Sequence, residues 1–254
     1  MLNKSVIEIN NLKTQFGQTV IHQALNLKIP GGEIVALIGD SGSGKSTLLR
    51  EIIRLEKPVS GSIYVFGQDV LKLHHAQLFW LHRRCGMMFQ QGALFSSLTV
   101  AENVAVPLSE HTQLSPNFIQ EIAILKMAMV GLPASARNKY PAQLSGGMIK
   151  RAAIARALAL EPDILFLDEP TAGLDPISAE AFDELILQLK EMLGLTVVIV
   201  THDVDLLWKV ADKIAVLADK SILTIVPIDE LIQLDCAWLQ KYFKGPRGRV
   251  AHNR

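Results

Sequence analysis

The sequence lacks the features that mark membrane-spanning, secreted or metal-cluster proteins. Its clearest apolar runs are of strand length, well below the ~18 residues that a membrane-spanning helix needs. The first residues, Met1–Ser5, lack the charged-then-apolar layout of a signal peptide. The two cysteines, Cys85 and Cys236, allow at most one disulfide and no metal cluster. We expect two free thiols in a reducing cytoplasm.

No charge of one sign dominates the 254 residues. Lys plus Arg and Asp plus Glu each number 25, so the formal net charge is zero. The absence of a basic field argues against nucleic acid as a partner. Charged residues make up 20% of the chain, below the ~25% of average soluble domains, and the mean hydropathy is +0.26. Two explanations remain open: an unusually buried sheet, or a surface that an apolar partner covers.

Strands that alternate with helical segments predict an α/β fold. Glu33–Ile38, Ile164–Leu167 and Val197–Val200 are almost wholly apolar, which is typical of strands buried on both faces of a parallel sheet. Helical spacing of apolar residues covers Thr47–Leu55 and Ile177–Leu193. Two further strands are expected at Val6–Leu12 and Gly61–Gly67.

A long helical insertion predicts a second lobe. The pattern from about Val100 to Leu160 is mostly helical. We expect the helices there to be interrupted at four prolines: Pro107, Pro116, Pro133 and Pro141.

The first chemical motif is a glycine-rich loop between an apolar strand and a helix. It fits the pattern G-x-x-x-x-G-K-[ST] and consists of Gly39, Asp40, Ser41, Gly42, Ser43, Gly44, Lys45 and Ser46, with Thr47 next. Such loops turn backbone N–H groups around phosphate oxygens, and the following helix adds its dipole. We expect Lys45 to neutralise the β- and γ-phosphates and the Ser46 hydroxyl to bind Mg²⁺. The alternative interpretation is a simple Gly-Ser turn.

The second motif is a pair of carboxylates at the end of the apolar strand Ile164–Leu167. Ligands of open α/β sheets gather at the carboxyl ends of strands. Asp168 is suited to hold Mg²⁺, and Glu169 can polarise an attacking water as a general base. The alternative is a charged strand end at a turn.

The segment Leu144–Met148 reads Leu-Ser-Gly-Gly-Met and precedes an Ala-rich helical run. It resembles the signature of ABC ATPases, and the resemblance covers essentially the whole chain. Four further residues match family elements by that resemblance: Phe16 the aromatic that stacks on adenine, Gln90 the glutamine before the helical lobe, Asp175 the dimer-contact loop, and His202 the switch histidine. The alternatives are core packing for Phe16 and a plain helix cap for Ser145, Gly146 and Gly147.

The resemblance implies an α/β fold: a P-loop ABC ATPase with a RecA-like parallel-sheet core, an N-terminal antiparallel β subdomain and an inserted helical subdomain at about 91–160. The ATPase domain would span 1–243, followed by a basic tail at 244–254. It implies ATP and Mg²⁺ as cofactors, with Ser46, Gln90 and Asp168 at the metal and Glu169 and His202 catalytic. It also implies a head-to-tail homodimer in which the phosphate loop of one subunit faces Ser145, Gly146 and Gly147 of the other.

One departure from the signature narrows the resemblance. Met148 stands where the family usually has Gln, and this version is similar to the ATPase of Mla-type, MCE-associated phospholipid transport systems. That group implies a separate transmembrane permease, an MCE-domain lipid-binding protein, a small STAS-domain protein, and a peripheral location on the cytoplasmic face of the inner membrane. Alternatives are an ATPase for amino acids or lipoproteins, a non-transport ABC protein, and a P-loop kinase, which would lack the Ser-Gly-Gly element.

The apolar residues after Gln90 and the basic tail each have two possible roles. Apolar residues after Gln90 are expected either to line a groove for the permease or to form the lobe's own core: Leu94, Phe95, Leu98 and Val100. The basic tail either contacts a partner or anionic headgroups, at ~1 kcal/mol per charge near such a surface, or is solvated.

Overall fold

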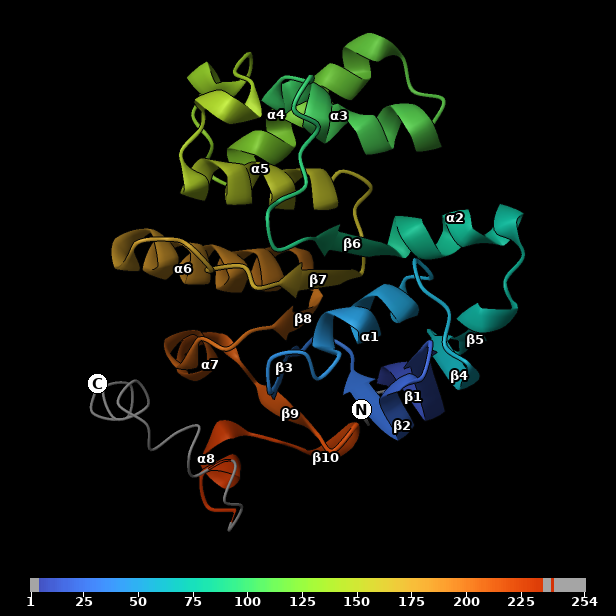
Figure 1. The fold of residues 1–254 in the computed structure, drawn as a ribbon. Helices are drawn as coiled ribbons and strands as arrows, with labels where there is room; N and C mark the ends of the chain where they lie inside the picture. The colour runs from blue at the N-terminus through green and yellow to red at the C-terminus, as the bar shows by residue number, and fades with distance from the viewer. Residues whose placement is uncertain (1–4, 235–238, 240–254) are drawn as a thin grey trace. The chain divides into compact units, whose positions relative to one another are not determined.

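The computed structural model describes residues 5–234 and residue 239 (Figure 1). The chain divides into two units, Met1–Leu78 with Thr196–Arg254, and Phe79–Leu195. The first boundary falls within helix α2 (His75–Arg84). Within the described ranges, no helix combines the length and the apolar character needed to cross a bilayer. Cys236 and the predicted tail at 244–254 lie outside these ranges.

The first unit contains an antiparallel sheet. Its strands follow the order β2 (Thr19–Pro30), β1 (Ser5–Phe16), β4 (Ser60–Val65) and β5 (Gln68–Asp69), and a 3₁₀ turn (Val70–Lys72) follows. Buried Ile7, Ile9 and Leu12 alternate with more accessible residues along β1, so one face of the sheet is apolar. The predicted N-terminal antiparallel subdomain is confirmed, although β1 extends four residues beyond the predicted strand end at Leu12.

The first unit also contains parallel strands. β3 (Ile34–Gly39) pairs in parallel with β8 (Thr196–Val200) and β9 (Lys213–Ala218), and β10 (Ser221–Val226) pairs antiparallel with β9. Every residue of β3 and β8 is buried, as their continuous apolar sequences predicted. Helices α1 (Lys45–Ile52), α7 (Val204–Val210) and α8 (Ile228–Leu231) complete the unit. The predicted parallel-sheet core is therefore confirmed.

The second unit joins two parallel strands to four helices. β6 (Cys85–Met88) pairs with β7 (Ile164–Asp168). The helices are α3 (Val100–His111), α4 (Pro116–Met129), α5 (Gly146–Ala157) and α6 (Pro176–Leu193), with 3₁₀ turns at Ala134–Ala136 and Pro141–Gln143. α3, α4 and α5 pack on one another. The expected helical segment is present, while the exact bounds of an inserted subdomain at 91–160 stay a prediction.

The prediction that Pro107 interrupts a helix is wrong, because α3 runs through it. Proline inside a helix removes one hydrogen bond and costs ~3 kcal/mol. Two features offset this cost. A capping box fixes the start of α3, where Thr99 N–H donates to Glu102 Oε2 at 2.7 Å. Val104 and Leu108, on either side of the proline, are almost fully buried. Pro116 instead occupies the first turn of α4, where its missing N–H is harmless.

Candidate functional site

The glycine-rich loop connects β3 to α1 in the first unit (Figure 1). Gly42 and Gly44 have φ values of 80° and 99°, in the region that side chains other than glycine rarely adopt. A Cβ atom at Gly39 would lie 2.3 Å from the Leu217 carbonyl oxygen, so glycine is also needed there. Asp40, Ser41 and Gly42 are exposed, so the loop is open to a ligand at the N-terminus of α1.

Lys45 is the main cation of this loop. It is 9% exposed, and its Nζ donates to the carbonyl oxygens of Gly39 at 2.9 Å and Asp40 at 2.8 Å. Ser43 Oγ is buried and has no hydrogen-bond partner in the described part of the chain. A buried ammonium and an unpaired hydroxyl beside closely approaching glycine backbone fit an anionic phosphate group. Phosphate binding by these loop residues stays a prediction that this geometry fits.

Two other predicted site residues belong to the same unit. Phe16 is the last residue of β1 and its side chain is 50% exposed, so it is not a core residue. His202 is exposed and lies between the end of β8 and helix α7. Because β3 and β8 are parallel, with Leu37 opposite Val200, the glycine-rich loop and His202 follow the same edge of the sheet.

The paired carboxylates lie at the end of β7 in the second unit. Asp168, the last residue of the strand, is 3% exposed. Glu169 has φ 49°, a left-handed conformation that is unfavourable for a residue with a side chain. Such residues carry roughly 1–3 kcal/mol of strain and cluster at functional sites. Among the residues that the structure describes, eight other non-glycine residues share a positive φ, so this conformation adds to the argument for Glu169 only together with its place after β7.

Lys150 on α5 connects three segments of the second unit. It is 6% exposed, and its Nζ donates to the backbone carbonyls of Gln90 and, at 3.1 Å, of Glu169. Burial lowers the pKa of this ammonium, while the carboxylates of Glu169 and Asp168 raise it. Gln90, two residues after β6, and Glu169, directly after β7, are therefore both linked to helix α5 by one cation. Sequence reasoning missed this role, since the only signal was a lysine in the helix behind the Ser-Gly-Gly element.

Ser145 and Asp175 each cap a helix of the second unit. Ser145 Oγ accepts a hydrogen bond from Met148 N–H at 3.3 Å, and Asp175 Oδ1 accepts one from Ser178 N–H at 3.0 Å. The hydrogen bonds from Ser178 hold the pKa of Asp175 below its usual value. A Cβ atom at Gly146 would lie 3.7 Å from Leu174 Cδ2, so the two segments are neighbours. Ser145 therefore caps α5, which is compatible with either interpretation of the Ser-Gly-Gly element, and Ser145, Gly146 and Asp175 are exposed.

The donor chemistry of the predicted metal residues fits Mg²⁺. Ser46 offers a hydroxyl, Gln90 an amide oxygen and Asp168 a carboxylate, all hard oxygen ligands of the kind that Mg²⁺ prefers. Ser46 belongs to the first unit, and Gln90 and Asp168 belong to the second.

Comparisons with known proteins agree with these motifs. The model of the ABC transporter family matches residues 22–172, which include the loop, Gln90, Ser145, Asp168 and Glu169. The chain is 41% identical to the "Intermembrane phospholipid transport system ATP-binding protein MlaF" of Haemophilus influenzae, over 96% of this chain and 92% of the relative. It is 37% identical to the "Probable ribonucleotide transport ATP-binding protein mkl" of Mycobacterium tuberculosis, over 95% of this chain and 67% of the relative.

A solved structure shows the same fold. The dimeric post-hydrolysis state of the ATP-binding cassette MJ0796, bound to ADP and Pi, superposes with a TM-score of 0.80 at 34% sequence identity. The superposition covers 87% of this chain and 98% of that one.

Proposed function

The chain belongs to the ABC transporter family, and from this premise we propose that it hydrolyses ATP to power phospholipid transport between membranes through a separate permease. Phospholipid as the transported substrate is supported by the 41% identity over nearly the full length of a relative named for intermembrane phospholipid transport. The relative named for ribonucleotide transport is 37% identical and supplies the competing cargo, but a smaller share of its length is matched.

The phosphate groups of ATP are held by the glycine-rich loop of one subunit and by the Ser-Gly-Gly element of a second. The buried Lys45 faces its own loop carbonyls, a geometry that a phosphate can replace with charge-assisted hydrogen bonds. The exposed start of α5 offers a second anion-binding helix N-terminus on the same chain. The half-exposed ring of Phe16 serves as the adenine platform, and Asp175 contacts the second subunit. The dimeric, ADP-bound relative supports this arrangement.

Hydrolysis uses the carboxylate of Glu169 as general base towards water, with His202 at the γ-phosphate. Glu169 suits this role because its carboxylate directly follows the buried strand β7 and Lys150 holds its backbone carbonyl. Ser46, Gln90 and Asp168 would hold Mg²⁺, which supplies charge neutralisation at the β- and γ-phosphates. Lys150 connects the backbone of Gln90 to that of Glu169 by donating to both carbonyls.

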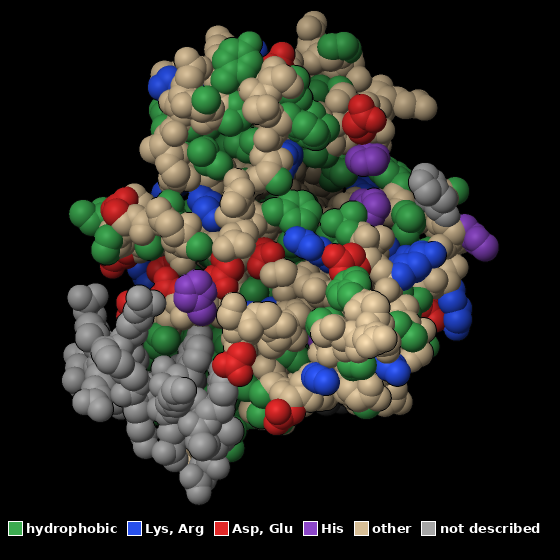
Figure 2. All heavy atoms as spheres, in the orientation of Figure 1, with side chains coloured by type: hydrophobic (Ala, Val, Ile, Leu, Met, Phe, Trp, Pro, Cys, Tyr) green, Lys and Arg blue, Asp and Glu red, His purple; other side chains and the backbone are tan. Residues whose placement is uncertain are grey.

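The permease docks on the helical segment of the second unit. Figure 2 shows hydrophobic side chains on the surface of this segment. Six large apolar side chains there are at least a third exposed: Phe95, Leu114, Phe118, Ile124, Leu125 and Tyr140. Of the residues that sequence reasoning left open, Val100 is fully buried and belongs to the core, while Phe95 is 51% exposed and available to a partner. An MCE-domain protein, a STAS-domain protein and the cytoplasmic face of the inner membrane complete the proposed setting.

Capture of the native complex tests the cargo. The chain carries an affinity tag, and the complex is extracted from membranes for identification of its proteins and lipids. Recovery of a permease, an MCE-domain protein and phospholipid supports the proposal. Recovery of a permease with a soluble substrate-binding protein, without an MCE-domain protein or phospholipid, overturns the cargo and leaves the ATPase assignment standing.

Mixed dimers test the two-subunit site. Ser145→Arg is expected to block hydrolysis while ATP still binds to the loop of the same chain. Mixed with Lys45→Ala, it restores at most one intact site per dimer. Equal loss of binding and hydrolysis in Ser145→Arg alone would contradict the shared site.

A further inference from the structure

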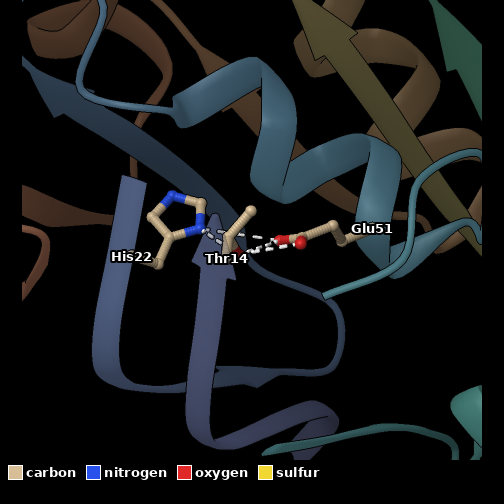
Figure 3. Close-up of polar contacts among 3 residues, drawn as sticks. All are labelled: Thr14, His22 and Glu51. Carbon is tan, nitrogen blue, oxygen red and sulfur yellow. Dashed lines mark hydrogen bonds and ion pairs between the residues drawn. The ribbon is translucent and has the colours of Figure 1, made fainter. Parts of the chain in front are cut away.

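A polar cluster lies inside the otherwise apolar packing of the first unit, directly behind the glycine-rich loop (Figure 3). It consists of Thr14 on β1, His22 on β2 and Glu51 on α1, each at most 1% exposed. Thr14 Oγ1 lies 2.8 Å from Glu51 Oε1 and 3.0 Å from Oε2. His22 Nδ1 lies 2.8 Å from Thr14 Oγ1 and 3.5 Å from Glu51 Oε2. We call these three residues the polar clamp.

The hydrogen bonds of the polar clamp have a defined direction. The single hydroxyl proton of Thr14 is donated to the carboxyl group of Glu51. The Thr14 oxygen then accepts from His22, which places a proton on Nδ1. The hydroxyl is therefore the link through which the β1–β2 hairpin holds helix α1.

The other side of the His22 ring faces the glycine-rich loop. Nε2 is buried and has no hydrogen-bond partner within the described ranges. A Cβ atom built on Gly44 would lie 2.5 Å from this nitrogen and 2.3 Å from Ile21 Cγ2, so the ring packs against the residue that begins α1. An apolar side chain at position 22 would fill this space and leave no buried nitrogen unpaired. The presence of His22 therefore indicates a role besides packing.

The polar clamp thus holds α1 at both ends and connects it to the strand that carries Phe16. Glu51 lies near the C-terminal end of α1, and Gly44 is its N-cap. Phe16 ends β1 two residues after Thr14. The two halves of the proposed nucleotide site in this unit, adenine platform and phosphate loop, are therefore joined through buried side chains.

We propose that Thr14, His22 and Glu51 are positioning residues that fix the glycine-rich loop relative to Phe16, so that one ATP molecule meets both. The inference rests on the proposed adenine role of Phe16. It makes a specific prediction: weakening the clamp lowers affinity for ligands that carry a base, and leaves ligands made only of phosphate unaffected.

The test compares two substitutions of Thr14 in the full chain. Thr14→Val keeps the shape and removes the hydroxyl, whereas Thr14→Ser keeps the hydroxyl. We expect Thr14→Val to raise the Kd for ATP about tenfold, the worth of one hydrogen bond, and Thr14→Ser to stay within about twofold of wild type. The Kd for inorganic tripolyphosphate and kcat at saturating ATP should both change less than about twofold in Thr14→Val. An equal rise in Kd for tripolyphosphate would overturn the proposal.

A second variant controls for misfolding, since Thr14→Val removes the hydrogen bonds of Thr14 to the buried Glu51. Thr14→Val, His22→Leu and Glu51→Leu together remove every polar group of the clamp, so no buried group is left unpaired. This triple variant should fold and show the same selective loss of ATP affinity. Wild-type ATP affinity in the folded triple variant would show that the clamp serves packing alone.

Phe16→Ala separates the two levels of inference. If it weakens ATP binding and the effect of Thr14→Val disappears in its background, the clamp acts through Phe16 as proposed. If Phe16→Ala weakens binding while Thr14→Val and the triple variant do not, only the clamp is wrong. If Phe16→Ala binds ATP like wild type, the adenine platform is wrong and the clamp proposal falls with it.

Discussion

Replacing Lys150 by methionine would remove the shared cation while keeping most of the side-chain volume. Two part-buried backbone carbonyls, those of Gln90 and Glu169, would lose the donor that Lys150, itself 6% exposed, supplies. A buried acceptor left unpaired costs ~1–3 kcal/mol, so the pair costs ~2–6 kcal/mol. Burial of the Lys150 ammonium, which lowers its pKa, is itself unfavourable, so removing this charge offsets part of that cost. We therefore expect the unfolding free energy to fall by about 2–4 kcal/mol.

The effect on turnover should exceed what this stability loss explains. Glu169 has a strained backbone at φ 49°, and Lys150 holds its carbonyl. Once released, the carboxylate would shift, and a misplacement of ~1 Å reduces a rate by on the order of 10²-fold. Steady-state ATP hydrolysis, ATP affinity and denaturant unfolding measured on the same preparation would show kcat falling by this factor with ATP binding retained.

Lys126→Met is the matched control. Lys126 is a second buried lysine of the same unit, 3% exposed, but its Nζ pairs with Glu161 at 3.1 Å, and the Glu161 side chain is 81% exposed. Its loss should lower stability modestly, because water can solvate Glu161, and should leave kcat unchanged. Lys150→Arg, which retains a cation with several donors, should recover part of the activity. The reasoning is refuted if Lys150→Met and Lys126→Met have kcat values within about twofold of each other.

Three shorter predictions follow from single residues. Gly44→Ala and Gly61→Ala should each destabilise the chain, because both have φ near 100° and a Cβ would clash, but only Gly44→Ala should abolish ATP binding in a fluorescence titration. Cys85, whose pKa burial raises to about 12, should not react with a thiol reagent at pH 8 in Cys236→Ser until denaturant is added. Hydrogen bonds from Thr99 lower the pKa of Glu102, so its contribution to stability is present above pH 4.5 and lost as pH falls through the lowered pKa; Glu102→Gln should flatten this acid limb in circular dichroism.

Features that depend on near neighbours in the chain were predictable from sequence. The glycine-rich loop lies between a buried strand and a helix as expected, since its shape depends on glycines within a few residues. Asp168 ends a buried strand as expected, because the short apolar run before it is stable only when it is buried in a sheet. The helix start at Pro116 likewise depends on adjacent residues.

Contacts between distant residues were not predictable. Thr14 and Glu51 are 37 positions apart, and Lys150 and Gln90 are 60 apart, so no local pattern relates them. β6 reads Cys-Gly-Met-Met, a weak strand sequence that forms because Cys85 to Met88 pair with β7. α3 continues through Pro107 because burial on both sides outweighs the lost hydrogen bond. In each case tertiary packing overrides the local preference.

The bonds of Lys45 to its own loop have a consequence for binding kinetics. Lys45 Nζ donates to the carbonyls of Gly39 and Asp40, so hydrogen bonds within the loop connect its end to its beginning. Its conformational entropy is therefore lost during folding, and an arriving phosphate meets a receptor that is already shaped. The phosphate then only has to replace the carbonyl oxygens of Gly39 and Asp40 as hydrogen-bond acceptors of the Lys45 ammonium. This exchange is local and needs no rearrangement of the backbone. The loop should accordingly behave as a rigid receptor, with association governed by diffusion and charge, and the slow steps of the cycle lying elsewhere in the molecule.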